Sequence, residues 1–169
     1  MVSPSEISEV LSAHPGVTRA EAAVVRHEGR EVTVAAVELS EYLSGPVLRN
    51  HVRERLGEDN GLAGVLVTDA IPTTGGALDV DELAAAVADG RCTLFEDPRD
   101  EVERRVAQIW SAQMAVPAVG VTDDFLELGG DSLSALGIIA AIETEFDRSI
   151  DVFEFMNAAS VRRLAELLR

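Results

Sequence analysis

The chain has 169 residues, enough for one medium domain or two small ones. It carries 30 acidic residues against 14 basic ones, for a net charge of -16, and every basic residue is an arginine because the sequence contains no lysine. So acidic a surface repels nucleic acid and anionic membranes and favours protein partners with basic docking faces, with acidity that serves solubility alone as the alternative. No apolar run approaches the roughly 20 residues that cross a bilayer and no signal pattern opens the chain, so we expect a soluble, cytoplasmic protein.

The first half of the chain alternates helical and extended patterns. Residues 4–13 place apolar side chains at helical spacing behind Ser3 and Pro4, which suits the start of a helix. Residues 21–26 and 31–39 are rich in valine and alanine around the turn residues 28–30, which predicts a β-hairpin. The remaining expected elements are a helix over 46–56, a strand over 64–68, a loop over 72–76 and a short helix over 80–87.

The second half of the chain is expected to be wholly helical. The periodicity lapses between residues 88 and 98, which marks a domain boundary. Beyond it, Val102, Val106, Ile109 and Trp110 form one apolar stripe along a helix over 100–114. The remaining expected elements are a long loop over 117–132, a helix over 133–146, a single turn over 152–156 and a closing helix over 161–168.

The string DDFLELGGDSL at residues 123–133 carries the most specific chemical signal. It resembles the attachment site of the carrier domains in nonribosomal peptide synthetases, and the resemblance extends from about Glu101 to Leu168. A bare GGDS arises often by chance, whereas the full string at the start of an amphipathic helix is far more specific. The resemblance implies that Ser132 is the attachment point of a phosphopantetheine arm, with Gly130, Asp131 and Leu133 as its immediate surroundings.

The residue types around Ser132 agree with that role. Gly129 and Gly130 allow backbone angles closed to other residues and leave room for a partner's active site to approach. Ser132 is placed where a helix begins, so a phosphodiester on it would lie beside free backbone N–H groups and the positive end of the helix dipole. The alternative is that Ser132 is merely the helix N-cap, a common role of serine.

Nothing near Ser132 can activate its hydroxyl, because the histidines His14, His27 and His51 all lie in the first half and there is no lysine. The resemblance therefore implies a separate phosphopantetheinyl transferase that supplies the base and Mg²⁺ and uses coenzyme A as the donor. It also implies a separate adenylating enzyme that loads the arm and downstream tailoring or condensation enzymes that unload it. We expect no metal site in the chain, since the lone Cys92 and the scattered histidines lack ligand spacing.

Residues from about Pro4 to Leu83 resemble the small C-terminal lid subdomain of the adenylating enzymes that precede carriers. In that family, a Gly-Lys-x-Asp step after a proline supplies a lysine that reaches the acyl and phosphate groups. The corresponding residues here are GALD at 76–79, so Ala77 occupies the lysine position. Alanine cannot neutralise developing phosphate charge, and the chain starts just past the family's hinge, without the large ATP-binding subdomain. We therefore expect a catalytically inactive remnant, and a carrier protein that is not an enzyme.

The expected fold is a small α+β lid-like domain over residues 1–88, with about three strands and flanking helices, then a linker over 89–98 and an all-α four-helix-bundle carrier domain over 99–169. We interpret the chain as a phosphopantetheine-dependent carrier that holds an aminoacyl or peptidyl thioester for nonribosomal peptide-type biosynthesis, loaded in trans. Two alternatives remain open. The lid could complete or dock onto a separate adenylation protein, or the chain could be an interaction module that never receives the arm.

Leu133 and Phe153 are the predicted partner-binding residues. In the turn over 152–156, the side chains of Val152, Phe155 and Met156 share one face and are expected to enter the core, which leaves Phe153 outside. Leu133 follows Ser132 directly, so its side chain would lie beside the arm. Single exposed apolar residues are common on protein surfaces, so chance is the competing explanation.

Overall fold

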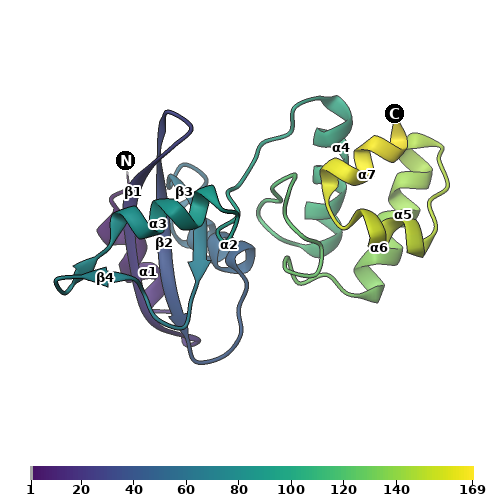
Figure 1. The fold of residues 1–169 in the computed structure, drawn as a ribbon. Coiled ribbons are helices and arrows are strands. Elements are labelled where there is room, and N and C mark those ends of the chain that lie inside the picture. Colours follow the sequence, from purple (N-terminus) through teal and green to yellow (C-terminus); the bar gives the residue numbers. More distant parts are fainter. Residues whose placement is uncertain (1) are drawn as a thin grey trace. The chain divides into compact units, whose positions relative to one another are not determined.

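The computed structural model describes residues 2–169, which form two compact units (Figure 1). The first unit ends at Leu94 and the second is Phe95–Arg169. The elements of the first unit are α1 (Pro4–Ser12), β1 (Val17–His27), β2 (Arg30–Leu39), α2 (Gly45–Leu56), β3 (Leu62–Val67), β4 (Thr73–Thr74), β5 (Ala77–Leu78) and α3 (Val80–Ala88). Those of the second are α4 (Glu101–Met114), α5 (Ser132–Phe146), α6 (Val152–Ala158) and α7 (Val161–Leu168). The predicted order, a small α+β unit followed by helices, matches the structure.

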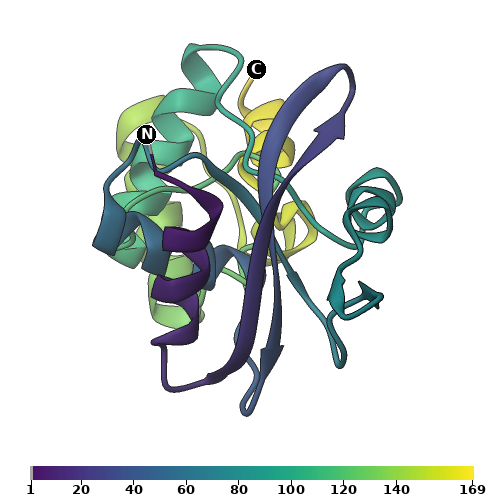
Figure 2. The same ribbon diagram turned by 90° about the vertical axis from the view of Figure 1, so that its left-hand side faces the viewer.

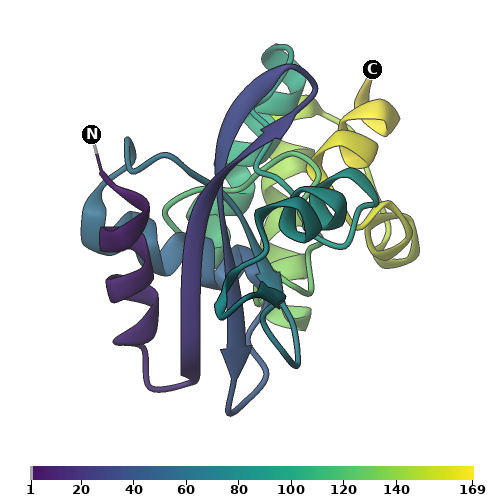
Figure 3. The same cartoon turned by 60° about the vertical axis from the view of Figure 1, so that its left-hand side comes forward.

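The three-stranded sheet of the first unit is buried on both faces. β1 and β2 pair antiparallel and β3 joins β2 in parallel, in the order β1-β2-β3. Side chains of β2 alternate between two cores: Ala35 and Val37 belong to the core with α1 and α2, whereas Val34 and Ala36 belong to the core with α3. Figures 2 and 3 show α1 and α3 on opposite sides of the sheet. A strand buried on both faces accounts for the continuous valine and alanine run in this segment.

Residues 72–76 form part of a second, smaller hairpin, so the prediction of a loop there was wrong. Thr73–Thr74 pairs with Ala77–Leu78 around Gly75 and Gly76, which both have positive φ. Two glycines at the turn suit a two-residue hairpin loop, whose central residues need left-handed angles. Strands of two residues are too short to show an alternating pattern, and the sequence therefore gave no sign of pairing.

Residues 89–98, expected to be a linker, contribute to both units. Cys92 is buried in the core beneath α3, and Leu94 packs against the same core and forms a bridge with Gly64. On the other side of the boundary, the Glu96 carbonyl accepts a hydrogen bond from the Val121 N–H at 3.0 Å. The units are therefore divided between Leu94 and Phe95, with packed backbone on either side.

An aromatic cluster forms the centre of the second unit. The ring of Phe125 lies 5.5 Å from that of Trp110 and 4.9 Å from that of Phe155, and all three side chains are fully buried. The buried carboxylate of Glu103 links α4 to α7. Its Oε2 accepts hydrogen bonds from Arg99 Nη2 at 2.9 Å and from Arg162 Nε at 3.4 Å. Burial alone would raise the pKa of Glu103, but the hydrogen bonds from these arginines lower it below its usual value.

The short helix α6 buries a different face from the one predicted. Phe155 and Ala158 are buried, whereas Val152 is 49% exposed and Met156 is 39% exposed. The expectation that Val152 and Met156 enter the core was wrong, because α6 continues beyond the predicted turn and contacts the core through the pair at i and i+3. Phe153 is 82% exposed, as its predicted position outside the core requires.

Across residues 2–169, none of the helices combines the length and the apolar character that crossing a bilayer demands. The cytoplasmic location stays a prediction.

Candidate functional site

The long loop that precedes Ser132 is fixed to the core of the second unit. The Phe125 N–H donates to the Ala159 carbonyl at 2.8 Å, and the Arg162 N–H donates to the Val121 carbonyl at 3.0 Å. Within the loop, the buried carboxylate of Asp123 accepts the Gly120 N–H at 2.8 Å. These bonds and the buried Phe125 ring attach the loop to the core just before α5 begins.

The two glycines before the helix have different reasons to be glycine. Gly129 has a φ of +92°, in the left-handed region that side chains avoid. Gly130 has no such angle, but a Cβ there would lie 2.4 Å from Cζ of Phe125. The absence of a side chain at Gly130 therefore makes room for the ring beneath it. This corrects the expectation for Gly130, whose reason is the Phe125 ring and not a special backbone angle, and confirms it for the backbone angle of Gly129.

Asp131 is the N-cap of α5. Its Oδ1 accepts the Ser134 N–H at 2.9 Å, and Ser134 Oγ accepts the Asp131 N–H at 2.9 Å, so the two residues form a capping box. Ser132 is the first residue of the helix, and the alternative interpretation of this serine as the N-cap is wrong. Within residues 2–169 no hydrogen bond involves its hydroxyl, and the side chain is exposed to solvent.

The electrostatic surroundings of Ser132 are acidic. The hydrogen bond from the Ser134 N–H, reinforced by the Ser134 hydroxyl, lowers the pKa of Asp131. Burial raises the pKa of Glu127, and the neighbouring carboxylates of Asp124 and Asp123 raise it further. Asp131 is therefore ionised more readily than usual, whereas Glu127 holds its proton more readily than usual.

One surface cavity is lined by Ser132, and a second is lined by its neighbours Asp131 and Leu133. The first, which we call the α5–α6 groove, has a volume of about 460 Å³ and is lined by Phe125, Leu126, Asp131, Ser132, Ala135, Leu136, Val152 and Met156. The second, which we call the α4–α5 hollow, has a volume of about 580 Å³ and is lined by Gln113, Met114, Gly129, Asp131, Leu133, Ser134, Leu136 and Gly137. Six of the eight groove residues have apolar side chains, so the groove is the more apolar of the two.

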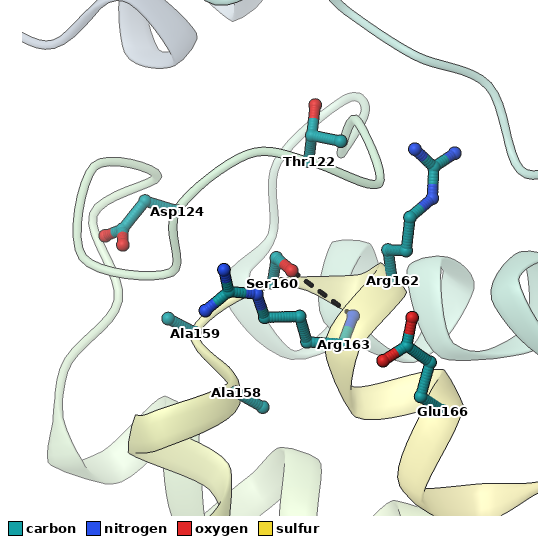
Figure 4. Close-up of a pocket in the computed structure, with 8 residues that line it drawn as sticks. All are labelled: Thr122, Asp124, Ala158, Ala159, Ser160, Arg162, Arg163 and Glu166. Atoms are coloured by element: carbon teal, nitrogen blue, oxygen red, sulfur yellow. Dashed lines mark hydrogen bonds between the residues drawn. The ribbon is translucent and has the colours of Figure 1, made fainter.

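A third cavity, of about 480 Å³, lies at the start of α7 and does not include Ser132 (Figure 4). Its charged side chains are Asp124, Arg162, Arg163 and Glu166, two of each sign. Arg162 already pairs with Glu96 at 2.7 Å. The Arg163 N–H donates to Ser160 Oγ at 3.3 Å, an N-cap bond of α7. Ser160 of this cavity is thus engaged at the start of α7, and Arg162 is engaged in an ion pair.

The other predicted site residues lie as follows. Leu133 is 80% exposed beside Ser132, and Phe153 is exposed on α6. Ala77 lies in β5 of the small hairpin of the first unit and is exposed. Sequence reasoning missed the groove residues Val152 and Met156, because the rotation of a two-turn helix depends on its packing. It also missed the support that Phe125 gives Gly130, although Phe125 lies within the motif string.

Comparison with known proteins bears on the same region. Residues 104–168 match the family model described as the phosphopantetheine attachment site. Over 96% of its length, the chain is 35% identical to the isonitrile lipopeptide synthase of Mycobacterium tuberculosis (strain ATCC 25618 / H37Rv). Over 56% of its length, it is 37% identical to the N-(5-amino-5-carboxypentanoyl)-L-cysteinyl-D-valine synthase of Amycolatopsis lactamdurans. The chain spans only 7% and 3% of these two relatives.

Among solved structures, that of McyG A-PCP complexed with phenylalanyl-adenylate is similar to 98% of the chain, at 21% identity and a TM-score of 0.44, and the chain covers 30% of it. The family match defines the class: residues 104–168 are a phosphopantetheine attachment domain, and the cofactor is phosphopantetheine derived from coenzyme A. The predicted cofactor is confirmed.

Proposed function

We propose that the chain holds an aminoacyl or peptidyl thioester on a phosphopantetheine arm attached to Ser132. The observation that carries the proposal is the position of Ser132. It is the first residue of α5, its hydroxyl is exposed, and the preceding residues include the N-cap Asp131 and the buried Phe125. That position lies inside the family match over residues 104–168. When attached, the arm supplies a terminal thiol that forms the thioester.

The attachment step needs a partner enzyme. The Ser132 oxygen forms a bond to phosphorus and loses its proton, while the pyrophosphate bond of coenzyme A breaks and releases the nucleotide. Since the second unit contains neither histidine nor lysine, we assign the base and Mg²⁺ to a separate phosphopantetheinyl transferase. Between Arg105 and Arg148 the chain has seven acidic residues and no basic one, which favours a transferase with a basic docking face.

Intact-mass measurement tests the attachment. After incubation with coenzyme A and a phosphopantetheinyl transferase, we expect one phosphopantetheine addition on the native chain and none on Ser132→Ala. A thiol titration gives a second readout, because burial raises the pKa of Cys92 to about 11 and keeps that thiol unreactive. The reactive thiol gained should therefore be the arm's. No addition, or an addition that survives Ser132→Ala, would contradict the proposal.

For the first unit we propose a catalytically inactive remnant of an adenylation lid, so that loading occurs in trans. Ala77 supports this, since it places a methyl group where a cation would have to neutralise phosphate charge. We expect the chain alone to show no amino-acid-dependent ATP–pyrophosphate exchange, and Ala77→Lys not to restore it. Exchange above background in a preparation free of other adenylating proteins would contradict this. The role that remains for this unit is docking or solubility.

We also propose that Leu133 and Phe153 belong to the surface that partner enzymes read, including downstream tailoring or condensation enzymes. Both side chains are exposed without a structural need for an apolar residue. Truncation of either side chain to alanine should weaken the binding of a partner enzyme by about 1–2 kcal/mol while the fold stays intact. The test is aminoacyl loading and downstream transfer for each variant beside thermal unfolding. Unchanged loading and transfer in both variants would remove these residues from the interface.

A further inference from the structure

The segment that connects the two units, residues 95–99, is attached to the second unit through Glu96. The main-chain carbonyl of Glu96 accepts a hydrogen bond from the Val121 N–H at 3.0 Å. Its carboxylate accepts another from Arg162 Nη1 at 2.7 Å, which makes an ion pair. We call these two bonds the Glu96 latch.

The residues that hold Glu96 belong to the loop before α5 and to the start of α7. They are bonded to each other, because the Arg162 N–H donates to the Val121 carbonyl at 3.0 Å. The guanidinium of Arg162 also donates from Nε to the buried carboxylate of Glu103 at 3.4 Å. These bonds do not involve Glu96, so they fix the position of Arg162 whether or not the latch is closed.

Opening the latch costs the second unit little. The side chain of Glu96 is 50% exposed in the ion pair, so water solvates it readily on release. Exposed ion pairs of this kind stabilise weakly, because hydration and side-chain entropy offset most of the Coulomb attraction. On opening, Arg162 and Glu103 keep their bond to each other, and no buried charge is left unpaired. The losses are the bond to Val121 and the contacts of the partly buried Phe95, so the closed and open states lie close in free energy.

The latch determines how much free chain joins the two units. Leu94 is fixed in the first unit by its bridge with Gly64. When the latch is closed, the free chain runs from Leu94 to Glu96 and spans at most about 7 Å. When it is open, the next fixed residue is Arg99, whose main-chain N–H donates to Glu103 at 3.0 Å. The free chain then spans up to about 18 Å.

We propose that the Glu96 latch is a conformational device that sets the reach of the second unit, short when closed and longer when open. This inference goes beyond the proposed attachment at Ser132 and does not depend on it. A tethered group meets a partner only if its linker can span the distance, and the effective concentration is highest when the linker length matches that distance. A linker with two lengths therefore serves partners at two distances.

The mobility of a spin label on the segment tests the latch. Asp97 is exposed beside Glu96, and a nitroxide attaches to Asp97→Cys alone, because burial raises the pKa of Cys92 to about 11. We expect a slow and a fast spectral component, from the closed and open states. Raising salt from about 0.1 M to about 1 M shortens the screening length from about 10 Å to about 3 Å and should increase the fast fraction. A single component at every salt concentration overturns the proposal.

Two alanine variants of the labelled chain form a matched pair. Glu96→Ala removes the carboxylate of the latch, and Arg163→Ala removes a neighbouring guanidinium that has no hydrogen bond or ion pair among residues 2–169. Figure 4 shows the side chains of Arg162 and Arg163 pointing in different directions. Both substituted residues are exposed, so we expect both variants to fold. Glu96→Ala should raise the fast fraction about two- to fivefold and remove its salt dependence, whereas Arg163→Ala should change neither. Equal fast fractions in the two variants overturn the proposal.

A distance measurement tests the reach itself. Nitroxides at Glu58→Cys in the first unit and Ala140→Cys in the second, both exposed positions, report the spread of distances between the units. The distribution should be wider in Glu96→Ala than in the chain with the native latch, and unchanged in Arg163→Ala. An unchanged distribution in Glu96→Ala overturns the proposal. Both experiments use the chain without phosphopantetheine, so their failure leaves the proposed function intact, and failure of the addition at Ser132 leaves the latch intact.

Discussion

Both units contain a glycine pair shortly before a helix that an aspartate caps, but only the pair in the second unit lies within the match to the phosphopantetheine attachment site. Gly75–Gly76 precedes Asp79, the N-cap of α3, and Gly129–Gly130 precedes Asp131, the N-cap of α5. In the first unit both glycines have positive φ and a Cβ on either would meet open space. In the second unit a Cβ on Gly130 would enter the Phe125 ring.

The comparison shows that a glycine pair followed by an N-cap residue predicts the start of a helix, but does not by itself predict a functional site. In the first unit the hairpin that carries Ala77 is exposed, and Thr74 Oγ1 donates a hydrogen bond to Asp79 Oδ2 at 2.8 Å. In the second unit the helix start lies on an aromatic core, which fixes the position of the residue that follows the cap. Stability probes can follow each unit separately, because Trp110 is the only tryptophan and Tyr42 the only tyrosine.

Removing the aromatic support should have the largest effect. Phe125→Ala deletes a fully buried ring in contact with Trp110 and Phe155, so the second unit should lose about 3–5 kcal/mol of unfolding free energy. The adjacent Leu126 is exposed, and Leu126→Ala should change stability by no more than about 0.5 kcal/mol. Denaturant titration followed by Trp110 fluorescence measures both. Equal effects of the two variants would show that the loop is not anchored as described.

Replacing one glycine of each pair by alanine should destabilise the two units for different reasons. Gly130→Ala forces a Cβ against the Phe125 ring and should destabilise the second unit by about 1–3 kcal/mol. Gly76→Ala meets no atom within 4 Å and costs only the strain of a left-handed alanine, about 1–2 kcal/mol, in the first unit. The Trp110 transition should therefore move for Gly130→Ala and stay in place for Gly76→Ala. An unchanged Trp110 transition in Gly130→Ala would show that the second unit does not depend on the ring contact.

Acidification should produce a smaller effect, and only in the first unit, which contains all three histidines. Burial lowers the pKa of His51 below 6.5, and His14, whose ring centre lies 4.8 Å away, and Arg55 lower it further, while Glu54 opposes them. The unfolded chain therefore takes up the proton before the folded chain does, and stability falls as the pH drops below 6.5.

The unfolding free energy, followed by Tyr42 fluorescence at pH values between 7 and 5, measures this loss of stability, and His51→Gln is the control. The variant should show a shallower decline than the native chain over that range. The same decline in both would remove His51 as its source.

The extent to which the sequence predicts this structure depends on how local each feature is. Helices with long apolar stripes, such as α4, follow from their periodicity, and the DDFLELGGDSL string predicts the helix start at Ser132. Features that depend on packing were not predictable. The rotation of α6 exposes Met156, and the contact of Gly130 with Phe125 joins residues whose relation only the folded loop creates.

The most direct test of the central claim separates two serines of the same helix start. Ser132 bears no hydrogen bond from its hydroxyl among residues 2–169, whereas Ser134 Oγ accepts the Asp131 N–H at 2.9 Å in the capping box. Ser132→Ala should therefore abolish phosphopantetheine addition and change stability by no more than about 0.5 kcal/mol. Ser134→Ala should keep the addition and cost about 0.5–1.5 kcal/mol. Intact mass and Trp110-monitored unfolding of both variants decide the matter, and an addition on Ser132→Ala, or its loss in a folded Ser134→Ala, would contradict the account.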